Sequence, residues 1–276
     1  MVKNRLSSLL VEAVAVLICL LFVIPFVFAV INSFKTYPEM MESFIRLPNR
    51  LNFENYVKAW TVMKGLRPFI NSIIITVFSI IGIVLFSSMA AYKLSRTKDR
   101  KSWVIYLIFV FALVVPFHCY MIPLVKLTAS LKLTKSYIGI VLIYWGICMP
   151  YAIFLQHGFV KSIPYDIEES AVIDGCTPFK TFFFIVFPLM KPIVSTLIVI
   201  DVIMIWNDFL LPMLIIFMDR SLRTVPLVQY NLYGEYNNEW NTALAAMVLA
   251  VVPCVIFFIF MQKYIVRGIT SGSVKG

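Results

Sequence analysis

The chain alternates between long apolar runs and shorter polar segments. Six runs approach the length of about 20 apolar residues that a helix needs to cross the hydrocarbon core of a bilayer. They occupy residues 11–31, 70–92, 103–125, 137–158, 182–205 and 243–263. Within each run the apolar residues are continuous rather than alternating, which favours helices over the strands of a membrane barrel. The pattern predicts an all-α integral membrane protein with six transmembrane helices.

Composition agrees with this class. Of the 276 residues, 61% are hydrophobic and only 14% are charged, which is too apolar for a soluble domain. The first run is longer than the roughly 7–15 apolar residues of a signal peptide, and the residues after it lack a small-residue cleavage pattern, so we expect a retained span. The sequence contains no separate soluble segment and no obvious repeat, which predicts one membrane domain over residues 1–276.

Basic residues suggest the orientation. Lys and Arg concentrate in cytoplasmic loops, and residues 93–101 carry five of them. With Lys3 and Arg5 also inside, six spans return the basic C-terminus to the cytoplasm, which predicts an N-in, C-in topology. Residues 32–71, with six basic residues, and the acidic loop at 158–181 count against it. The net charge of +10 is divided among loops on both sides. This division indicates contact with membrane lipid and excludes a nucleic-acid surface.

Residues that could carry catalysis or bind a metal are sparse. The five cysteines lack CxxC spacing, and we expect small buried packing residues. His118 and His157 are far apart, so neither predicts a metal site. The one dense carboxylate cluster, Asp166 to Glu169, has no His or Cys beside it, which disfavours an integral-membrane enzyme. We therefore predict no catalytic residue and no metal.

The polar loop between the fourth and fifth runs predicts a short helix. Pro164 suits a first helical position, and the acidic residues after it complement the positive end of the helix dipole. Gly175 suits the left-handed residue after a helix end, and Thr177-Pro178 opens the next helix. We expect about three turns, with Ser170 and Ala171 small enough for close approach by a partner. The alternative, a helix lying on lipid, fits poorly because an anionic leaflet repels carboxylates.

This loop resembles the EAA loop of ABC-importer permeases. In that pattern Glu-Ala-Ala is followed by three residues, Gly, nine residues and Ile-x-Leu-Pro. The chain matches in register at Glu169, Ala171, Gly175, Ile185 and Pro188, and departs at Ser170 and Phe187. Both departures are mild, since one adds a hydroxyl and the other adds bulk.

Further stretches resemble the carbohydrate-uptake branch of these permeases, similar to the maltose-system G-type inner-membrane subunit. They are residues 51–56 (LNFENY), 69–72 (FINS), 90–96 (AAYKLSR), 121–124 (MIPL), 188–192 (PLMKP), 206–208 (WND) and 268–276 (GITSGSVKG). The likeness extends from about Pro25 to the last residue.

The resemblance implies a permease subunit that translocates a sugar or oligosaccharide across the bacterial cytoplasmic membrane by alternating access. Its implied partners are a second homologous permease, two ATP-binding subunits and an extracytoplasmic solute-binding protein. The ATP-binding subunits would use ATP and Mg, and this chain would bind no cofactor and be no enzyme. The absence of a GxxxxGK[ST] phosphate loop agrees. The implied coupling residues are Glu168, Glu169, Ser170, Ala171, Asp174 and Gly175.

Polar residues near the end of the fifth run are candidates for the translocation path. Asp201 is costly in mid-membrane, so it either lines the path or bonds a neighbouring helix. Trp206, Asn207 and Asp208 combine an aromatic ring with sugar-binding polar groups, although Trp206 also suits an interfacial belt. By resemblance, the loop that follows contacts the binding protein; the alternative is an ordinary solvated loop. Its candidate residues are Tyr230, Asn231, Tyr233, Tyr236 and Asn237.

Two other functions stay open. One is an ABC permease for another solute, such as glycerol phosphate. The other is a proton-coupled secondary transporter with Asp201 or Glu12 as its carrier site, which would need no acidic docking helix.

Overall fold

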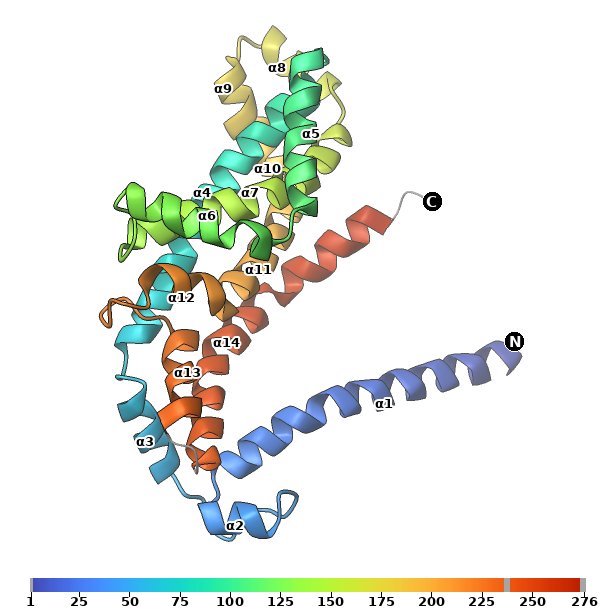
Figure 1. Ribbon diagram of the computed structural model, residues 1–276. Helices are drawn as coiled ribbons and strands as arrows, with labels where there is room; N and C mark the ends of the chain where they lie inside the picture. Colours follow the sequence, from blue (N-terminus) through green and yellow to red (C-terminus); the bar gives the residue numbers. More distant parts are fainter. Residues whose placement is uncertain (1, 236–238, 274–276) are drawn as a thin grey trace. The chain divides into compact units, whose positions relative to one another are not determined.

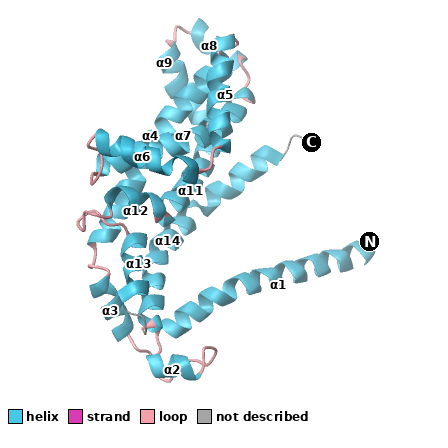
Figure 2. Cartoon of the chain, viewed as in Figure 1, coloured by secondary structure: helices cyan, strands magenta, loops and turns pink. Residues whose placement is uncertain are grey.

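Helices form all of the regular secondary structure in residues 2–235 and 239–273, which are the residues that the computed structural model describes (Figures 1 and 2). The chain divides into two compact units. Among the described residues, unit 1 comprises 2–66, 228–235 and 239–253, and unit 2 comprises 67–227 and 254–273. The prediction of an all-α protein is confirmed.

Unit 1 contains the first apolar run and the segments that flank it. Its helices are α1 (Val2–Ser33), α2 (Tyr37–Glu42), α3 (Glu54–Val62), most of α13 (Val225–Glu235) and the first part of α14 (Trp240–Ser273). α2 begins with a capping box, because the Thr36 side chain accepts from the N–H of Glu39 and the Glu39 carboxylate accepts from the N–H of Thr36. The bond that the Thr36 N–H donates favours the charged form of the Glu39 carboxylate and lowers its pKa.

Unit 2 contains the helices of the middle of the chain. They are α4 (Arg67–Arg96), α5 (Arg100–Val114), α6 (Phe117–Ser130), α7 (Tyr137–Lys161), α8 (Asp166–Ile173), α9 (Pro178–Lys180), the π-helix η1 (Thr181–Val186), α10 (Phe187–Leu189), α11 (Lys191–Asn207) and α12 (Leu210–Ile216).

Among the described residues, four helical segments are long and apolar enough to cross a membrane by themselves: Ser8–Ser33, Arg67–Arg96, Tyr137–Lys161 and Trp240–Lys263. Two further pairs pass the same test only when their two helices are taken together, which gives six spans at most. The structure therefore supports four to six spans, and the predicted number of six is its upper limit.

The third and fifth predicted spans are not straight helices. α5 and α6 meet at 106°, and the helices from Pro178 to Leu189 meet α11 at 73°. Val115 precedes Pro116 and is extended (φ −80°, ψ 113°), as expected for a residue whose αR conformation clashes with the proline ring. In a membrane helix a proline can be accommodated without ending the helix, because neighbouring groups satisfy the freed carbonyls. Pro25, Pro123, Pro150 and Pro253 lie inside helices in this way, whereas the chain leaves the helical conformation immediately before Pro116.

The core of unit 2 is built on α4 and α7, which pack along each other more extensively than any other helix pair in the described part of unit 2. A Cβ at Gly82 would overlap with the indole of Trp145, so the missing side chain is what lets the two helices approach. Gln156 of α7 is fully buried and donates to Ser87 of α4 at 2.6 Å, while its carbonyl accepts from Ser88. A glycine contact and two interhelical hydrogen bonds thus stabilise a helix pair that the hydrophobic effect alone would not hold together in lipid.

The cysteines differ in part from the expected buried packing residues. Cys148 is buried, and Cys176 and Cys254 are half-buried. Cys19 and Cys119 are exposed within this chain, so the expectation is wrong for these two. All five are free thiols. His157 lies against the ring of Tyr106, with 3.8 Å between ring centroids, in a stacked contact that joins α7 to α5.

Candidate functional site: the coupling helix and its anchor

The acidic loop forms the helix α8, which lies at the end of unit 2 where α4 ends and α5 begins (Figure 1). The helix begins at Asp166 and spans eight residues, about two turns, rather than the three expected. Pro164 lies outside it, because the carbonyl of Tyr165 accepts the first helical hydrogen bonds, from the N–H groups of Glu168 and Glu169. The acidic residues still occupy the first turn, where their charge complements the helix dipole.

The end of α8 has the predicted glycine bend. Gly175 has a φ of +80°, in the left-handed region. Its N–H donates to the carbonyl of Val172 at 3.0 Å, and the N–H of Cys176 donates to the carbonyl of Ala171 at 2.9 Å. This pair of hydrogen bonds defines a Schellman motif, which closes the helix through its otherwise unpaired carbonyls. No atom lies within 4 Å of a Cβ at Gly175, so the requirement for glycine is conformational rather than steric.

The next segment also begins as the sequence predicts. Thr177 is the N-cap residue of α9, its hydroxyl accepting from the N–H of Lys180, and Pro178 is the first helical residue. The chain then continues as the π-helix η1, whose wide turn was not predicted. Aromatic rings pack around it, including Phe182 against Tyr92 of α4, with ring centroids 5.2 Å apart.

One face of α8 is fastened to α4. The Glu168 carboxylate lies 2.7 Å from Nη2 of Arg96 and also accepts from Nε of Arg96 and from the hydroxyl of Tyr92, each within 3.0 Å. Arg96 donates in addition to the carbonyl of Ile163 at 2.9 Å, and its guanidinium lies over the ring of Tyr165. Glu168 is buried, and so is Ala171 one turn later. Both residues therefore pack against other parts of this chain.

The other face of α8 is open and partly apolar. Ile173 is 85% exposed and Val172 is 61% exposed, and Glu169, Ser170 and Asp174 are exposed as well. Beside this face is a hollow of about 480 Å³. It is lined by Tyr92, Tyr165, Glu168, Glu169, Val172, Ile173, Pro178 and Thr181. Exposed apolar residues next to carboxylates are the chemistry of a protein-docking surface.

The structure thus divides the six predicted coupling residues. Glu169, Ser170, Asp174 and Gly175 are exposed, whereas Glu168 and Ala171 form the inner face. The sequence reading missed the exposed Ile173 and Val172 and the anchoring role of Arg96. Arg96 ends the stretch 90–96 that carries the family likeness, but no sequence signal identified Glu168 as its partner.

The four predicted translocation-path residues do not share one environment. Asp201 of α11 is buried, and its Oδ2 accepts no hydrogen bond from the described part of the chain. Trp206 is buried as well, and Asn207 is exposed and donates to the carbonyl of Ile203 in its own helix. Asp208 has a structural role. Its Oδ1 accepts from the N–H of Leu210 at 2.9 Å, and its Oδ2 accepts from the hydroxyl of Tyr144 on α7 at 3.0 Å.

The predicted binding-protein loop is largely helical. Tyr230 lies on α13 and is half-exposed. Asn231 and Tyr233 belong to the same helix, and the structure does not describe their side chains. Tyr236 and Asn237 lie outside the described residues.

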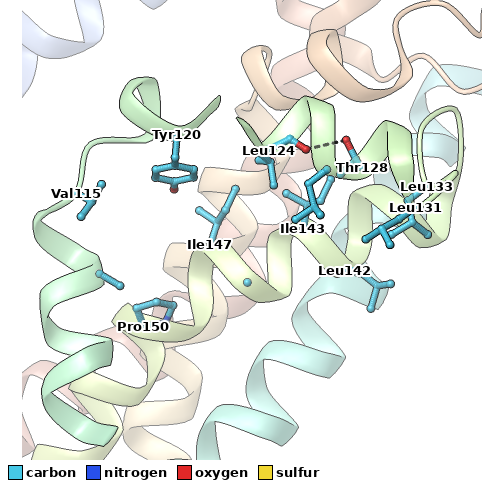
Figure 3. Close-up of a pocket in the computed structure, with 13 residues that line it drawn as sticks. Val115, Tyr120, Leu124, Thr128, Leu131, Leu133, Leu142, Ile143, Ile147 and Pro150 are labelled. Atoms are coloured by element: carbon cyan, nitrogen blue, oxygen red, sulfur yellow. Dashed lines mark hydrogen bonds between the residues drawn. The ribbon is translucent and has the colours of Figure 1, made fainter. Parts of the chain in front are cut away.

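An apolar cavity of about 420 Å³ lies at the bend between α5 and α6 and is also lined by residues of α7. Figure 3 shows its lining residues. Leu124, Ile143 and Ile147 line it, together with the ring of Tyr120. The hydroxyl of Thr128 donates within its own helix, to the carbonyl of Leu124 at 3.0 Å. The lining therefore offers little for polar recognition. Among the described residues there is also no group of three His, Cys, Asp or Glu side chains placed to hold a metal ion.

Comparison with known proteins agrees with these features. Residues 83–271 match the family described as binding-protein-dependent transport system inner membrane component. The chain is 39% identical over 274 residues to the probable starch degradation products transport system permease protein AmyC of Thermoanaerobacterium thermosulfurigenes, covering 99% of each chain. It is 34% identical over 259 residues to the multiple sugar-binding transport system permease protein MsmG of Streptococcus mutans, covering 93% of each.

A solved structure shows the same fold. A chain in the crystal structure of a bacterial ABC transporter involved in the import of the acidic polysaccharide alginate superimposes with a TM-score of 0.79 at 22% identity, covering 95% of this chain and 97% of that chain. The family match spans more than half of the sequence and the relatives align over nearly all of it. The chain therefore belongs to the family of inner membrane components of binding-protein-dependent transport systems, and its fold is that of an ABC importer permease.

Proposed function

We propose that the chain is the permease subunit of an ATP-driven importer that carries a sugar or oligosaccharide across the bacterial cytoplasmic membrane. The observation that carries this proposal is the full-length similarity to permeases named for carbohydrate substrates. Besides the two relatives above, the melibiose/raffinose/stachyose import permease protein MelC of Bacillus subtilis is 31% identical over 271 residues and aligns over 98% of each chain.

The proposed topology has six spans, with each bent helix pair counted as one, and with both termini in the cytoplasm. The basic residues of 93–101 support this orientation. In it, α8 lies on the cytoplasmic side, and the segment of residues 34–66 that follows α1 lies on the extracytoplasmic side.

The proposed partners are a second homologous permease, two ATP-binding subunits and an extracytoplasmic solute-binding protein. The family description, which names binding-protein-dependent transport, supports the last of these. The ATP-binding subunits use ATP and Mg, since this sequence has no phosphate-binding loop of its own. The chain itself binds no cofactor in this proposal.

Coupling to ATP hydrolysis passes through α8. Its exposed face, with Glu169, Val172 and Ile173, docks against an ATP-binding subunit. Because Glu168 is bonded to Arg96 and Tyr92, a displacement of α8 also displaces the end of α4. α4 packs along α7, so both helices move together and change which side of the membrane the path faces. Asp201, Trp206, Asn207 and Asp208 remain our candidates for the path, and α13 with Tyr230 our candidate for contact with the binding protein.

Reconstitution tests the proposal. The chain would be co-expressed with the second permease and the ATP-binding subunits that neighbouring genes encode. The purified complex would then be placed in proteoliposomes with the binding protein outside. We expect uptake of a labelled oligosaccharide that requires both ATP inside and the binding protein. Glu169→Lys should abolish uptake while Gly158→Ala, an exposed position of α7 with free space around its Cβ, should not. Uptake by the chain alone under a proton gradient, without ATP, would contradict the proposal.

A further inference from the structure

A loop after α2, residues 44–52, begins and ends beside the last turn of α1. At its start, the Nδ2 of Asn32 donates to the carbonyl of Phe44 at 2.9 Å. At its end, the N–H of Asn52 donates to the carbonyl of Phe34, the residue after α1, at 2.9 Å. A compact segment of this length whose two ends lie close together is an Ω-loop. The 44–52 loop is therefore fastened to α1 at both ends.

The buried side chain of Lys35 fixes the start of this loop. A lysine is almost never fully buried unless its charge is compensated. The ammonium of Lys35 donates to the Oδ1 of Asn32 at 2.9 Å and to the carbonyls of Ser43 and Phe44 at 2.8 and 3.3 Å. These acceptors match the three donors of an ammonium group. The loop therefore has a defined position relative to the end of α1.

This position is at the level of the membrane. The ring of Phe44 packs against the ring of Phe28 on α1, with ring centroids 6.3 Å apart. Phe28 lies in the candidate span Ser8–Ser33, about 7.5 Å from its end at a helical rise of about 1.5 Å per residue. Segments that bind a bilayer surface are inserted to a depth of about 5–10 Å. The loop thus folds back along α1 to that depth, whichever side of the membrane α1 ends on.

At this depth the loop exposes apolar side chains. Ile45 is 73% exposed and Leu47 is 70% exposed, and Leu51 near the other end of the loop is exposed as well. Exposed apolar side chains that lie together mark a contact with a membrane or with another protein. The apolar side chains of the neighbouring α1 span are also exposed. The loop therefore continues the apolar surface of a membrane-crossing helix, and lipid is the contact that its position favours.

The charge of the loop favours anionic lipid in particular. The loop contains two arginines, Arg46 and Arg50, and no acidic residue. Arg46 lies 4.0 Å from Glu42, but both side chains are largely exposed, so this ion pair is weak. Arginine forms paired, charge-assisted hydrogen bonds with phosphate groups. Its long apolar stem also lets the guanidinium reach the headgroups from a position beside the hydrocarbon.

We propose that the 44–52 loop is an interfacial anchor that binds anionic phospholipid. Ile45 and Leu47 insert among the acyl chains beside the end of α1, and Arg46 and Arg50 bind the phosphate groups of the same leaflet. The partner of this surface is the lipid and not a protein subunit. The inference requires only that α1 crosses the membrane, and it does not depend on which solute is transported.

The test asks what touches the loop in a bilayer. The protein is purified with the subunits that accompany it and placed in nanodiscs of equal parts phosphatidylethanolamine and phosphatidylglycerol. The variant Leu47→p-benzoylphenylalanine is irradiated, and its adducts are identified by mass spectrometry. We expect phospholipid adducts, with phosphatidylglycerol in excess. Ile45→p-benzoylphenylalanine, at the other exposed apolar position, should give the same result and serves if the first variant fails to assemble.

A second measurement tests the arginines. Adding Arg46→Gln and Arg50→Gln to the photoreactive variant should lower the ratio of phosphatidylglycerol to phosphatidylethanolamine adducts by about threefold or more. Both positions are exposed, so the fold should be retained. Lys64→Asn is the matched control, because it removes an exposed positive charge of unit 1 outside the loop, and asparagine tolerates the left-handed φ of +64° at this position. This control should leave the ratio unchanged.

Three results would overturn the inference. Adducts to a protein subunit at position 47 would make the loop a protein contact, and the absence of lipid adducts from both photoreactive variants would place the loop in water. An unchanged lipid ratio after loss of both arginines would remove the phosphate-binding role. None of these results bears on ATP-dependent uptake, which tests the proposed function separately.

Discussion

Arg96, the last residue of α4, and Glu168 of α8 form an ion pair of 2.7 Å across 72 residues of sequence. The side chains are 15% and 6% exposed, so water screens the pair little. Since Tyr92 donates to the same carboxylate, the end of α4 holds the helix that we propose to dock against the ATP-binding subunit. The ion pair therefore connects the proposed docking helix α8 to α4 in the core of unit 2.

Breaking the Arg96–Glu168 ion pair should uncouple uptake from ATP hydrolysis. Arg96→Ala leaves the Glu168 charge buried and unpaired, a change that typically costs about 3–5 kcal/mol. We expect uptake to fall by more than tenfold and ATP hydrolysis to lose its dependence on the binding protein. The exchange Arg96→Glu with Glu168→Arg should restore part of the uptake, and Arg100→Ala, at an exposed position nearby, should change neither readout. Full coupling in Arg96→Ala would show that α8 transmits motion by another route.

The apolar tip of α8 should matter for docking and not for folding. Ile173→Ser alters a side chain that is 85% exposed, so it should change the free energy of unfolding of the isolated chain by no more than about 0.5 kcal/mol. We expect the ATP-binding subunit to be lost during co-purification. Met218→Ser, which changes a side chain that is 78% exposed elsewhere in unit 2, should retain it. Normal co-purification of Ile173→Ser would exclude this residue from the docking surface.

Gly175 should tolerate asparagine better than alanine. Its left-handed φ of +80° costs a residue with a Cβ about 1–2 kcal/mol, and asparagine less than alanine, while free space surrounds the position. Uptake should therefore decrease in the order Gly175, Gly175→Asn, Gly175→Ala. Gly158→Ala, in the helical backbone of α7, should be neutral or slightly stabilising. Equal activity of the two Gly175 variants would mean that the bend does not position α8.

Contact between α4 and α7 should depend on Gly82. An added methyl group would overlap with the indole of Trp145, whose Nε1 donates to the carbonyl of Phe78 at 3.2 Å. We expect Gly82→Ala to cost about 1–3 kcal/mol, as overpacking in tight contacts does, and to lower the melting temperature of the purified complex. Gly146→Ala, on α7 with no atom within 4 Å of the new Cβ, is the matched control. Equal melting temperatures for both variants would show that Trp145 moves aside freely.

Much of this protein follows from short stretches of sequence. Continuous apolar runs predicted the helical membrane class, because an unpaired backbone cannot exist in hydrocarbon. The glycine bend at Gly175 and the cap at Thr177 were also predictable, since capping depends on residues within one helical turn. Local rules were less successful for prolines. Pro164 was predicted to begin α8 and lies outside it, and the break before Pro116 was not predicted.

The tertiary structure decided everything that joins distant residues. Sequence spacing alone could not pair Glu168 with Arg96, because an ion pair depends on which helix faces meet. The same holds for the hydrogen bond between Tyr144 and Asp208, and for the one between Asn55 and Asn241, 186 residues apart. Periodicity and capping act over a few residues, whereas burial and hydrogen-bond partners are properties of the packed chain.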